Sequence, residues 1–214
     1  MSSSASRHPL RVGMFGGAFD PPHLAHRELA AAALEQLELD VLHILPTGQA
    51  WHKTRQLTAA RDRLAMCEQA FASLPRVRLD DREIRRAGPS YTADTLAELA
   101  AEYPQAQLFL VMGADQLLAF KSWVRWQEVA ERATLAVANR PMSPSPGEPD
   151  TAESDLAQLG VPFEPLSMPL RPISATAVRA HLAKPGGQAA EWDVLVPEGV
   201  ARYISDHHLY ETPT

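Results

Sequence analysis

The 214-residue sequence contains one cysteine, Cys67, and therefore cannot form an intrachain disulfide or a cysteine-cluster metal site. It lacks an apolar run long enough to span a membrane, and residues 1–9 lack the apolar stretch of a signal peptide. Basic residues are outnumbered by acidic ones, and the net charge of −6 argues against a nucleic-acid-binding protein. We therefore expect a cytoplasmic protein with no membrane or nucleic-acid partner.

Strands and helices alternate along the chain. Apolar runs predict strands at 10–15, 41–45, 76–79, 108–112, 134–138 and 163–166. Helical spacing of apolar residues predicts helices at 23–37, 58–74, 92–102, in pieces over 116–132, at 151–159, and at 173–182 and 197–208. This alternation implies an α/β fold with a Rossmann-like, doubly wound parallel sheet flanked by helices.

The same pattern predicts the domain organisation. Residues 1–9 are polar and serine-rich, which favours a disordered tail. Residues 10–214 are expected to form a single domain with a C-terminal helical portion at about 173–210. Cys67 has helical spacing with Leu64 and Phe71, and we predict that it lies in the core.

The stretch from residue 13 to residue 26 reads Gly-Met-Phe-Gly-Gly-Ala-Phe-Asp-Pro-Pro-His-Leu-Ala-His. A strand, a tight glycine turn and a helix start, in that order, arrange backbone N–H groups around a concave anion site. Gly16 and Gly17 allow the backbone to approach a phosphate closely. His23 and His26 are three residues apart and would share one face of a helix. We predict that this is the active site and that it acts on a polyphosphate.

Other interpretations of the histidine pair have weaker support. A lone histidine early in a helix is more often structural, but two of them directly after a glycine turn favour a functional role. A zinc site would need a third ligand at motif spacing, and a zinc protease would also need a helical glutamate. The sequence also contains no Gly-Lys-Ser/Thr pattern, which argues against an ordinary P-loop NTPase or kinase.

Two segments resemble the motifs of the nucleotidyltransferase superfamily. Residues 16–26 are similar to its signature, usually written with a T/H-x-G-H core, although Ala25 stands where glycine is usual. Residues 173–179, Ile-Ser-Ala-Thr-Ala-Val-Arg, resemble its I-S-x-T-x-x-R motif. Ser174 is suited to cap a helix, and Arg179 offers a forked cation for phosphate.

The resemblance implies that a phosphate or similar oxygen attacks the α-phosphorus of a nucleoside triphosphate and expels pyrophosphate. His23, His26 and Arg179 are then catalytic, and Mg²⁺ is carried by ATP or pyrophosphate rather than by a metal site of the protein. Gly113 and Asp115 follow the most apolar strand, where α/β folds bind ligands. The implied ATP-binding residues are Gly16, Gly17, Ala18, Phe19, His23, His26, Gly113, Asp115, Ile173, Ser174, Thr176 and Arg179.

Three further stretches are similar to bacterial nicotinate-mononucleotide adenylyltransferases. They are residues 83–96 with their Ser-Tyr-Thr-x-Asp-Thr core, residues 113–117 followed by Trp123, and the His52-Lys53 pair, which lacks the usual preceding prolines. In that family the tyrosine–threonine turn offers amides to the nicotinate carboxylate, and the tryptophan stacks on the pyridine ring. The implied mononucleotide-binding residues are His52, Lys53, Tyr91, Thr92, Asp115 and Trp123.

The implied function is transfer of AMP from ATP to nicotinate mononucleotide, giving nicotinate adenine dinucleotide (deamido-NAD) and pyrophosphate in NAD synthesis. One alternative is the same chemistry on nicotinamide mononucleotide or phosphopantetheine. The phosphopantetheine enzymes are shorter and lack the Ser-Tyr-Thr-x-Asp-Thr stretch. Another alternative, from a different class, is a non-catalytic nucleotide-binding module. The sequence does not determine the oligomeric state, and a homo-oligomer is compatible with it.

Overall fold

The computed structural model describes residues 8–48, 57–138, 158–169, 172–183 and 193–210. Within these residues the strands form one parallel sheet in the order β3-β2-β1-β4-β5-β6. The strands are β1 (Arg11–Gly17), β2 (Val41–Pro46), β3 (Val77–Leu79), β4 (Gln107–Gly113), β5 (Thr134–Ala138) and β6 (Glu164–Leu166).

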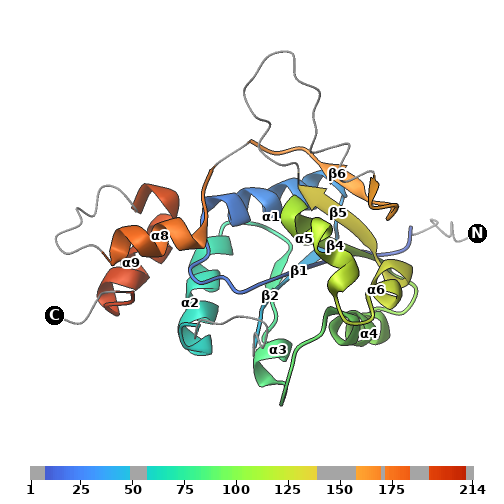
Figure 1. Cartoon of the computed structure of the whole chain (residues 1–214), viewed down its shortest axis with the longest axis horizontal. Helices are drawn as coiled ribbons and strands as arrows, with labels where there is room; N and C mark the ends of the chain where they lie inside the picture. Colours follow the sequence, from blue (N-terminus) through green and yellow to red (C-terminus); the bar gives the residue numbers. More distant parts are fainter. Residues whose placement is uncertain (1–7, 49–56, 139–157, 170–171, 184–192, 211–214) are drawn as a thin grey trace, which may run out of the picture.

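Helices cover both faces of this sheet (Figure 1). One face is covered by α1 (Leu24–Gln36), α2 (Ala60–Phe71), α8 (Ala175–Leu182) and α9 (Glu198–Asp206). The other is covered by α4 (Thr92–Glu102), α5 (Ala114–Leu118) and α6 (Trp126–Arg132). The short elements are α3 (Arg82–Arg85), η1 (Phe120–Ser122) and η3 (Asp193–Leu195). The predicted doubly wound parallel sheet is confirmed.

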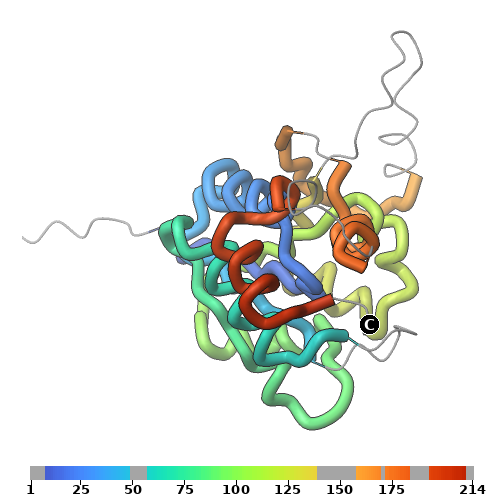
Figure 2. Tube along the Cα trace, turned by 90° about the vertical axis from the view of Figure 1, so that its left-hand side faces the viewer, coloured from blue at the N-terminus to red at the C-terminus, as the bar shows by residue number. Residues whose placement is uncertain are grey.

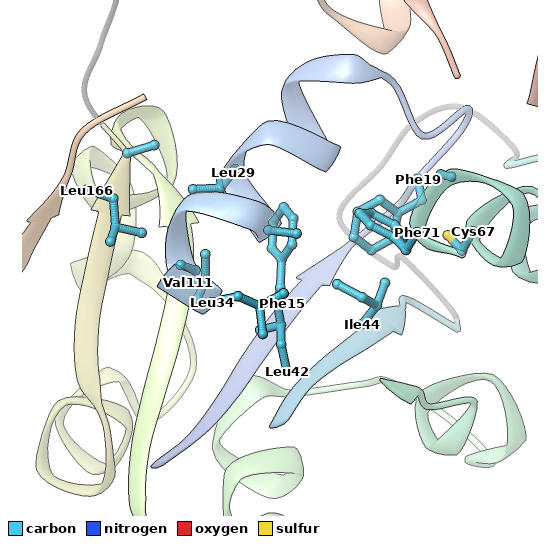
Figure 3. Close-up of a cluster of buried hydrophobic side chains, with 14 of the residues drawn as sticks. Phe15, Phe19, Leu29, Leu34, Leu42, Ile44, Cys67, Phe71, Val111 and Leu166 are labelled. Carbon is cyan, nitrogen blue, oxygen red and sulfur yellow. The ribbon is translucent and has the colours of Figure 1, made fainter. Parts of the chain in front are cut away.

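The strands are apolar throughout because both of their faces are buried. In β4, Phe109 and Val111 point into the cluster under α1 and α2, whereas Leu108 and Leu110 point into the cluster under α4, α5 and α6. Figure 3 shows the first cluster, with Cys67 on α2 among its buried side chains. The predicted core position of Cys67 is confirmed.

The strand order reverses between β1 and β4, and this reversal positions the site. The paired register ends at Met14 and Leu110, three residues before Gly17 and Gly113 respectively. From these ends α1 packs on one face of the sheet and α5 on the other. In open α/β sheets, ligands bind at the carboxyl ends of the strands at such a reversal.

Several predicted boundaries were wrong. His23 precedes α1 instead of beginning it. Thr92, whose side chain and following Asp94 favour a helix N-cap, is instead the first residue of α4, and Tyr91 is the N-cap. The predicted helix over 58–74 is shorter, since α2 spans Ala60–Phe71. Residues 1–7 of the predicted tail and 151–157 of a predicted helix lie outside the described residues.

Residues 80–90, whose charged side chains and Gly88-Pro89 pair predict a loop, contain α3, and Asp80 explains why. Its carboxylate accepts hydrogen bonds from the backbone N–H of Arg82 (3.1 Å) and from the Arg82 guanidinium. It also lies 2.8 Å from Nδ1 of His43 on β2. Burial disfavours the charged carboxylate, but the hydrogen bonds from His43 and Arg82 outweigh burial and hold the pKa of Asp80 well below its usual range.

No helix in the described ranges is long and apolar enough to cross a membrane.

Candidate active site

The turn that follows β1 is tightly packed and conformationally strained. Gly16 and Gly17 end the strand, and Ala18 leads into Phe19, whose φ of 44° lies in the left-handed region. That region is disfavoured for a bulky side chain, so surrounding contacts must stabilise it. The Phe19 ring is buried and makes edge contacts with neighbouring aromatic rings, among them Phe71 at 5.9 Å (Figure 3). The turn is therefore held by packing.

His23 and His26 meet directly after this turn. His23 has an extended backbone as the N-cap of α1, and its N–H donates to Nδ1 of His26 at 3.2 Å. The two rings stack, with centroids 3.6 Å apart. Because Nδ1 of His26 accepts this hydrogen bond, the proton of that ring is on Nε2, which can act as a donor. The two imidazoles are therefore close together, as predicted, although His23 is the N-cap of α1 and not part of one helical face with His26.

His23 is buried, with only 6% of its surface exposed. Its Nδ1 has no hydrogen-bond partner among the described residues. Burial lowers the pKa of His23 from 6.5 to about 4, because the positively charged ring loses its hydration. The imidazole is therefore neutral near pH 7 and able to serve as an N–H donor rather than as a cation.

This lowered pKa predicts a pH-dependent stability. Between pH 6.5 and about 4 the unfolded chain binds a proton at His23 that the folded chain does not. The free energy of unfolding of the wild type should therefore fall with decreasing pH, relative to His23→Gln, by about 3 kcal/mol across this interval. Urea denaturation of both proteins at several pH values measures this difference. A difference that stays constant with pH would contradict the assignment.

The I-S-x-T-x-x-R segment begins α8 and reaches the same turn. Ser174 caps the helix by accepting a hydrogen bond from the N–H of Ala177 at 3.1 Å, as predicted. Arg179 donates from Nη1 to the carbonyl oxygen of Asp20 at 2.6 Å and from Nη2 to Oγ1 of Thr176 at 3.1 Å. The hydrogen bond from Arg179 to Asp20 thus joins the two motifs, although these residues are 159 positions apart in the sequence. Ile173 packs against the core beside them.

Gly113 and Asp115 lie at the carboxyl end of β4. Gly113 is the N-cap of α5, and Asp115 is an exposed residue in the first turn of this helix. Among the described residues, a Cβ added at Gly113 would have no neighbouring atom within 4 Å. Protein packing therefore does not require glycine there, and the backbone is open to close approach by a ligand.

The predicted nicotinate-binding residues lie on the face of the sheet that α4, α5 and α6 cover. Tyr91 and Thr92 form the start of α4, and Trp123 follows η1, partly buried against Phe120 at a ring distance of 5.5 Å. Arg125, two residues beyond Trp123, forms an ion pair with Asp94 in the first turn of α4. This ion pair links the two predicted binding segments.

The loop after β2 is pressed against α3, which the sequence did not indicate. A Cβ at Gly48 would lie 2.1 Å from the carbonyl oxygen of Glu83, so a side chain there would displace backbone. The buried carboxylate of Glu83 in turn accepts a hydrogen bond from Thr95 Oγ1 on α4 at 2.9 Å, and burial raises the pKa of Glu83. The predicted phosphate-binding pair, His52 and Lys53, lies outside the described residues.

Sequence analysis also did not identify Arg63 as a residue that supports the turn. It lies on α2 and is buried, with 1% exposed, which is rare for arginine. Its Nη1 donates to the carbonyl oxygen of Ala18 and its Nε to that of Thr58, both at 2.9 Å. A single arginine in a helical pattern usually indicates a solvated side chain, so no signal in the sequence marks it.

Within the described ranges, no group of three or more His, Cys, Asp or Glu side chains is arranged to hold a metal ion.

The fold and the site together define a cytidylyltransferase-like protein, and the sequence profile of that family matches residues 14–181. A relative from Albidiferax ferrireducens, named a probable nicotinate-nucleotide adenylyltransferase, is 49% identical over 202 residues, which cover 94% of this chain and 98% of the relative. One from Methylibium petroleiphilum is 44% identical and covers all of this chain and 97% of the relative. The chain belongs to the nicotinate-nucleotide adenylyltransferase family.

Solved structures share the fold at low sequence identity. The Plasmodium falciparum nicotinic acid mononucleotide adenylyltransferase complexed with APC has a TM-score of 0.75 at 16% identity, covering 94% of this chain and 97% of its own. The same enzyme complexed with NaAD has a TM-score of 0.73 with the same identity and coverage. The arrangement of strands and helices is therefore shared with nucleotide-binding enzymes.

Proposed function

We propose that this chain transfers AMP from ATP to nicotinate mononucleotide, giving nicotinate adenine dinucleotide and pyrophosphate. The observation that carries the proposal is the convergence of two motifs at the end of β1. Arg179 of the second motif donates to the turn that precedes the stacked pair His23 and His26. The names of the full-length relatives support the choice of substrates.

The reaction is an in-line displacement. A bond forms between a phosphate oxygen of the mononucleotide and the α-phosphorus of ATP, and the bond from that phosphorus to the oxygen bridging to the β-phosphorus breaks. The attacking phosphate needs no general base, because its second pKa is about 6. The protein therefore supplies positioning and donors for the charge on the transferring group.

The donors come from the two motifs. Neutral His23 and the Nε2–H of His26 would face the transferring phosphoryl oxygens, and the start of α8 with Ser174 would face the triphosphate. Arg179 combines a fixed position against the turn with a forked cation for phosphate.

ATP would bring Mg²⁺ to the site. Asp115 is an exposed carboxylate at the carboxyl end of β4, and carboxylate oxygens suit Mg²⁺ or water bound to it. When bound, Mg²⁺ would neutralise the charge of the leaving pyrophosphate.

Recognition of the pyridine base would come from the other side of the site. Tyr91 is the N-cap of α4 and Thr92 is its first residue, at a helix start where backbone N–H groups favour a carboxylate. The indole of Trp123 would stack on the cationic pyridinium ring. The amide mononucleotide carries no negative charge at this position and would lose the first of these contacts.

The test is pyrophosphate release with ATP and Mg²⁺, in parallel with nicotinate or nicotinamide mononucleotide. Release with the acid alone is expected. Equal rates with both would keep the chemistry but discard the carboxylate contact at Tyr91 and Thr92. Release with neither would redirect the assay to phosphopantetheine. ATP binding without any release would favour a non-catalytic module.

A further inference from the structure

The carboxylate of Asp20 is the centre of a buried cluster beneath the turn. Asp20 is 2% exposed, directly follows the strained residue Phe19 and lies three residues before His23. Its Oδ1 accepts a hydrogen bond from the hydroxyl of Tyr210 at 2.7 Å, and its Oδ2 accepts one from the N–H of Thr58 at 3.3 Å. The turn is thus held by residues from distant parts of the chain.

Tyr210 has no role in the motifs, yet its side chain is directed into this cluster. It follows α9, packs against the core and lies with its hydroxyl 4.0 Å from the sulfur of Met66 on α2. Figure 2 shows α9, in red, packed beside α2. Burial, together with the charge of Asp20, raises the pKa of Tyr210 far above its usual range, so the hydroxyl remains a donor.

Both neighbours of Phe19 are hydrogen-bonded, which is what a strained turn requires. Arg63 holds the carbonyl oxygen of Ala18, and Tyr210 holds the side chain of Asp20. The two residues between Asp20 and His23 are prolines, whose rings fix φ. Because φ is fixed at both intervening positions, the backbone can absorb less of a displacement of Asp20 before it reaches His23.

We infer that Tyr210 is a positioning residue for the adenylyl transfer, acting through Asp20 to fix the turn that carries His23. The inference rests on the proposed function for its effect on rate. The hydrogen bond itself links Tyr210, the last described residue of the chain, to the turn that precedes His23.

The chain offers a matched control for testing this inference. The hydroxyl of Tyr203, on α9, donates a hydrogen bond to Oδ1 of Asp62 at 3.0 Å. This is also a tyrosine–aspartate hydrogen bond from the C-terminal region, but its acceptor lies on α2 and not in the turn. Neither residue of that pair contacts the turn in the hydrogen bonds of the described structure. Tyr210→Phe and Tyr203→Phe each remove one hydroxyl and leave the ring in place.

Tyr210→Phe is expected to lower kcat about tenfold, because a misplaced donor weakens stabilisation of the transition state. KM for nicotinate mononucleotide should change less than about twofold, since its predicted binding segments lie elsewhere. Tyr203→Phe should leave kcat unchanged. Hydrogen exchange of the amides at residues 17–20 and 23–24 should be faster in Tyr210→Phe than in wild type, and unchanged in Tyr203→Phe.

Equal kcat values for the two variants would overturn the inference. So would a loss of activity in Tyr210→Phe that matches its loss of folded protein, with exchange of the turn unaltered. The exchange measurement separates this inference from the proposed function. If the wild type releases no pyrophosphate, faster exchange in Tyr210→Phe alone still shows that Tyr210 fixes the turn, and unchanged exchange refutes that.

Discussion

Replacement of His26 by alanine is expected to lower kcat by about a hundredfold to a thousandfold, with little change in KM for either substrate. The Nδ1 atom of His26 is engaged by the N–H of His23, which leaves Nε2–H as the donating atom. The ring is further fixed between the His23 ring and the edge of Phe19, whose centroid lies 5.0 Å away. We expect a donor held this firmly to act on charge that develops only in the transition state.

Steady-state kinetics with each substrate varied in turn measures this effect. His207→Ala is the control, because His207 caps the end of α9 and stacks on Tyr203, away from the two motifs. Its kcat should equal that of the wild type. If His26→Ala instead raised KM for ATP and kept kcat, His26 would bind the ground state and the transition state equally, and its catalytic assignment would be wrong.

Replacement of Trp123 by alanine is expected to raise KM for nicotinate mononucleotide about tenfold and to leave KM for ATP nearly unchanged. The indole is only partly buried against the core, so part of its surface is accessible to a ligand. The ion pair between Arg125 and Asp94 holds this segment beside the start of α4, where the nicotinate carboxylate is predicted to bind. The pyridinium ring would lie between the indole of Trp123 and the start of α4.

Trp126→Ala is a closely matched control for this variant. Trp126 is also partly buried, and its ring contacts the same Phe120 ring at 5.9 Å, compared with 5.5 Å for Trp123. Both variants should lose similar stability on removal of an indole from one cluster. Only Trp123→Ala should weaken mononucleotide binding. Equal increases in KM for both substrates, or equal effects of both variants, would refute the stacking role.

The sheet was predictable because its strands carry their own signal. Strand β4 is apolar at consecutive positions, since both of its faces are buried, and it was found within one residue of the predicted ends. The short helix α3 was not predictable, because it depends on Asp80 and on its partner His43 on another strand. Such partners come together only through the tertiary fold.

The candidate site likewise contains residues that local sequence predicts and residues that only the tertiary fold defines. The stacked histidines and the capping by Ser174 follow from short motifs whose geometry is local. Arg63 and Tyr210 could not be found from local pattern, because each is defined by the distant turn atom that it contacts. The motifs in the sequence thus indicate the chemistry, and the structure shows which residues hold the turn in place.

The turn after β1 and the residues that hold it are far apart in the sequence, which affects the order in which they fold. The hydrogen bond from Tyr210 to Asp20 joins residues 190 apart in sequence, and that from Arg179 joins residues 159 apart. Contacts that close such long loops form slowly, after local helices and adjacent strands. During synthesis, β1 emerges from the ribosome long before these partners do. We therefore expect the sheet to assemble before the turn is completed, and a refolding chain to regain its secondary structure before its activity.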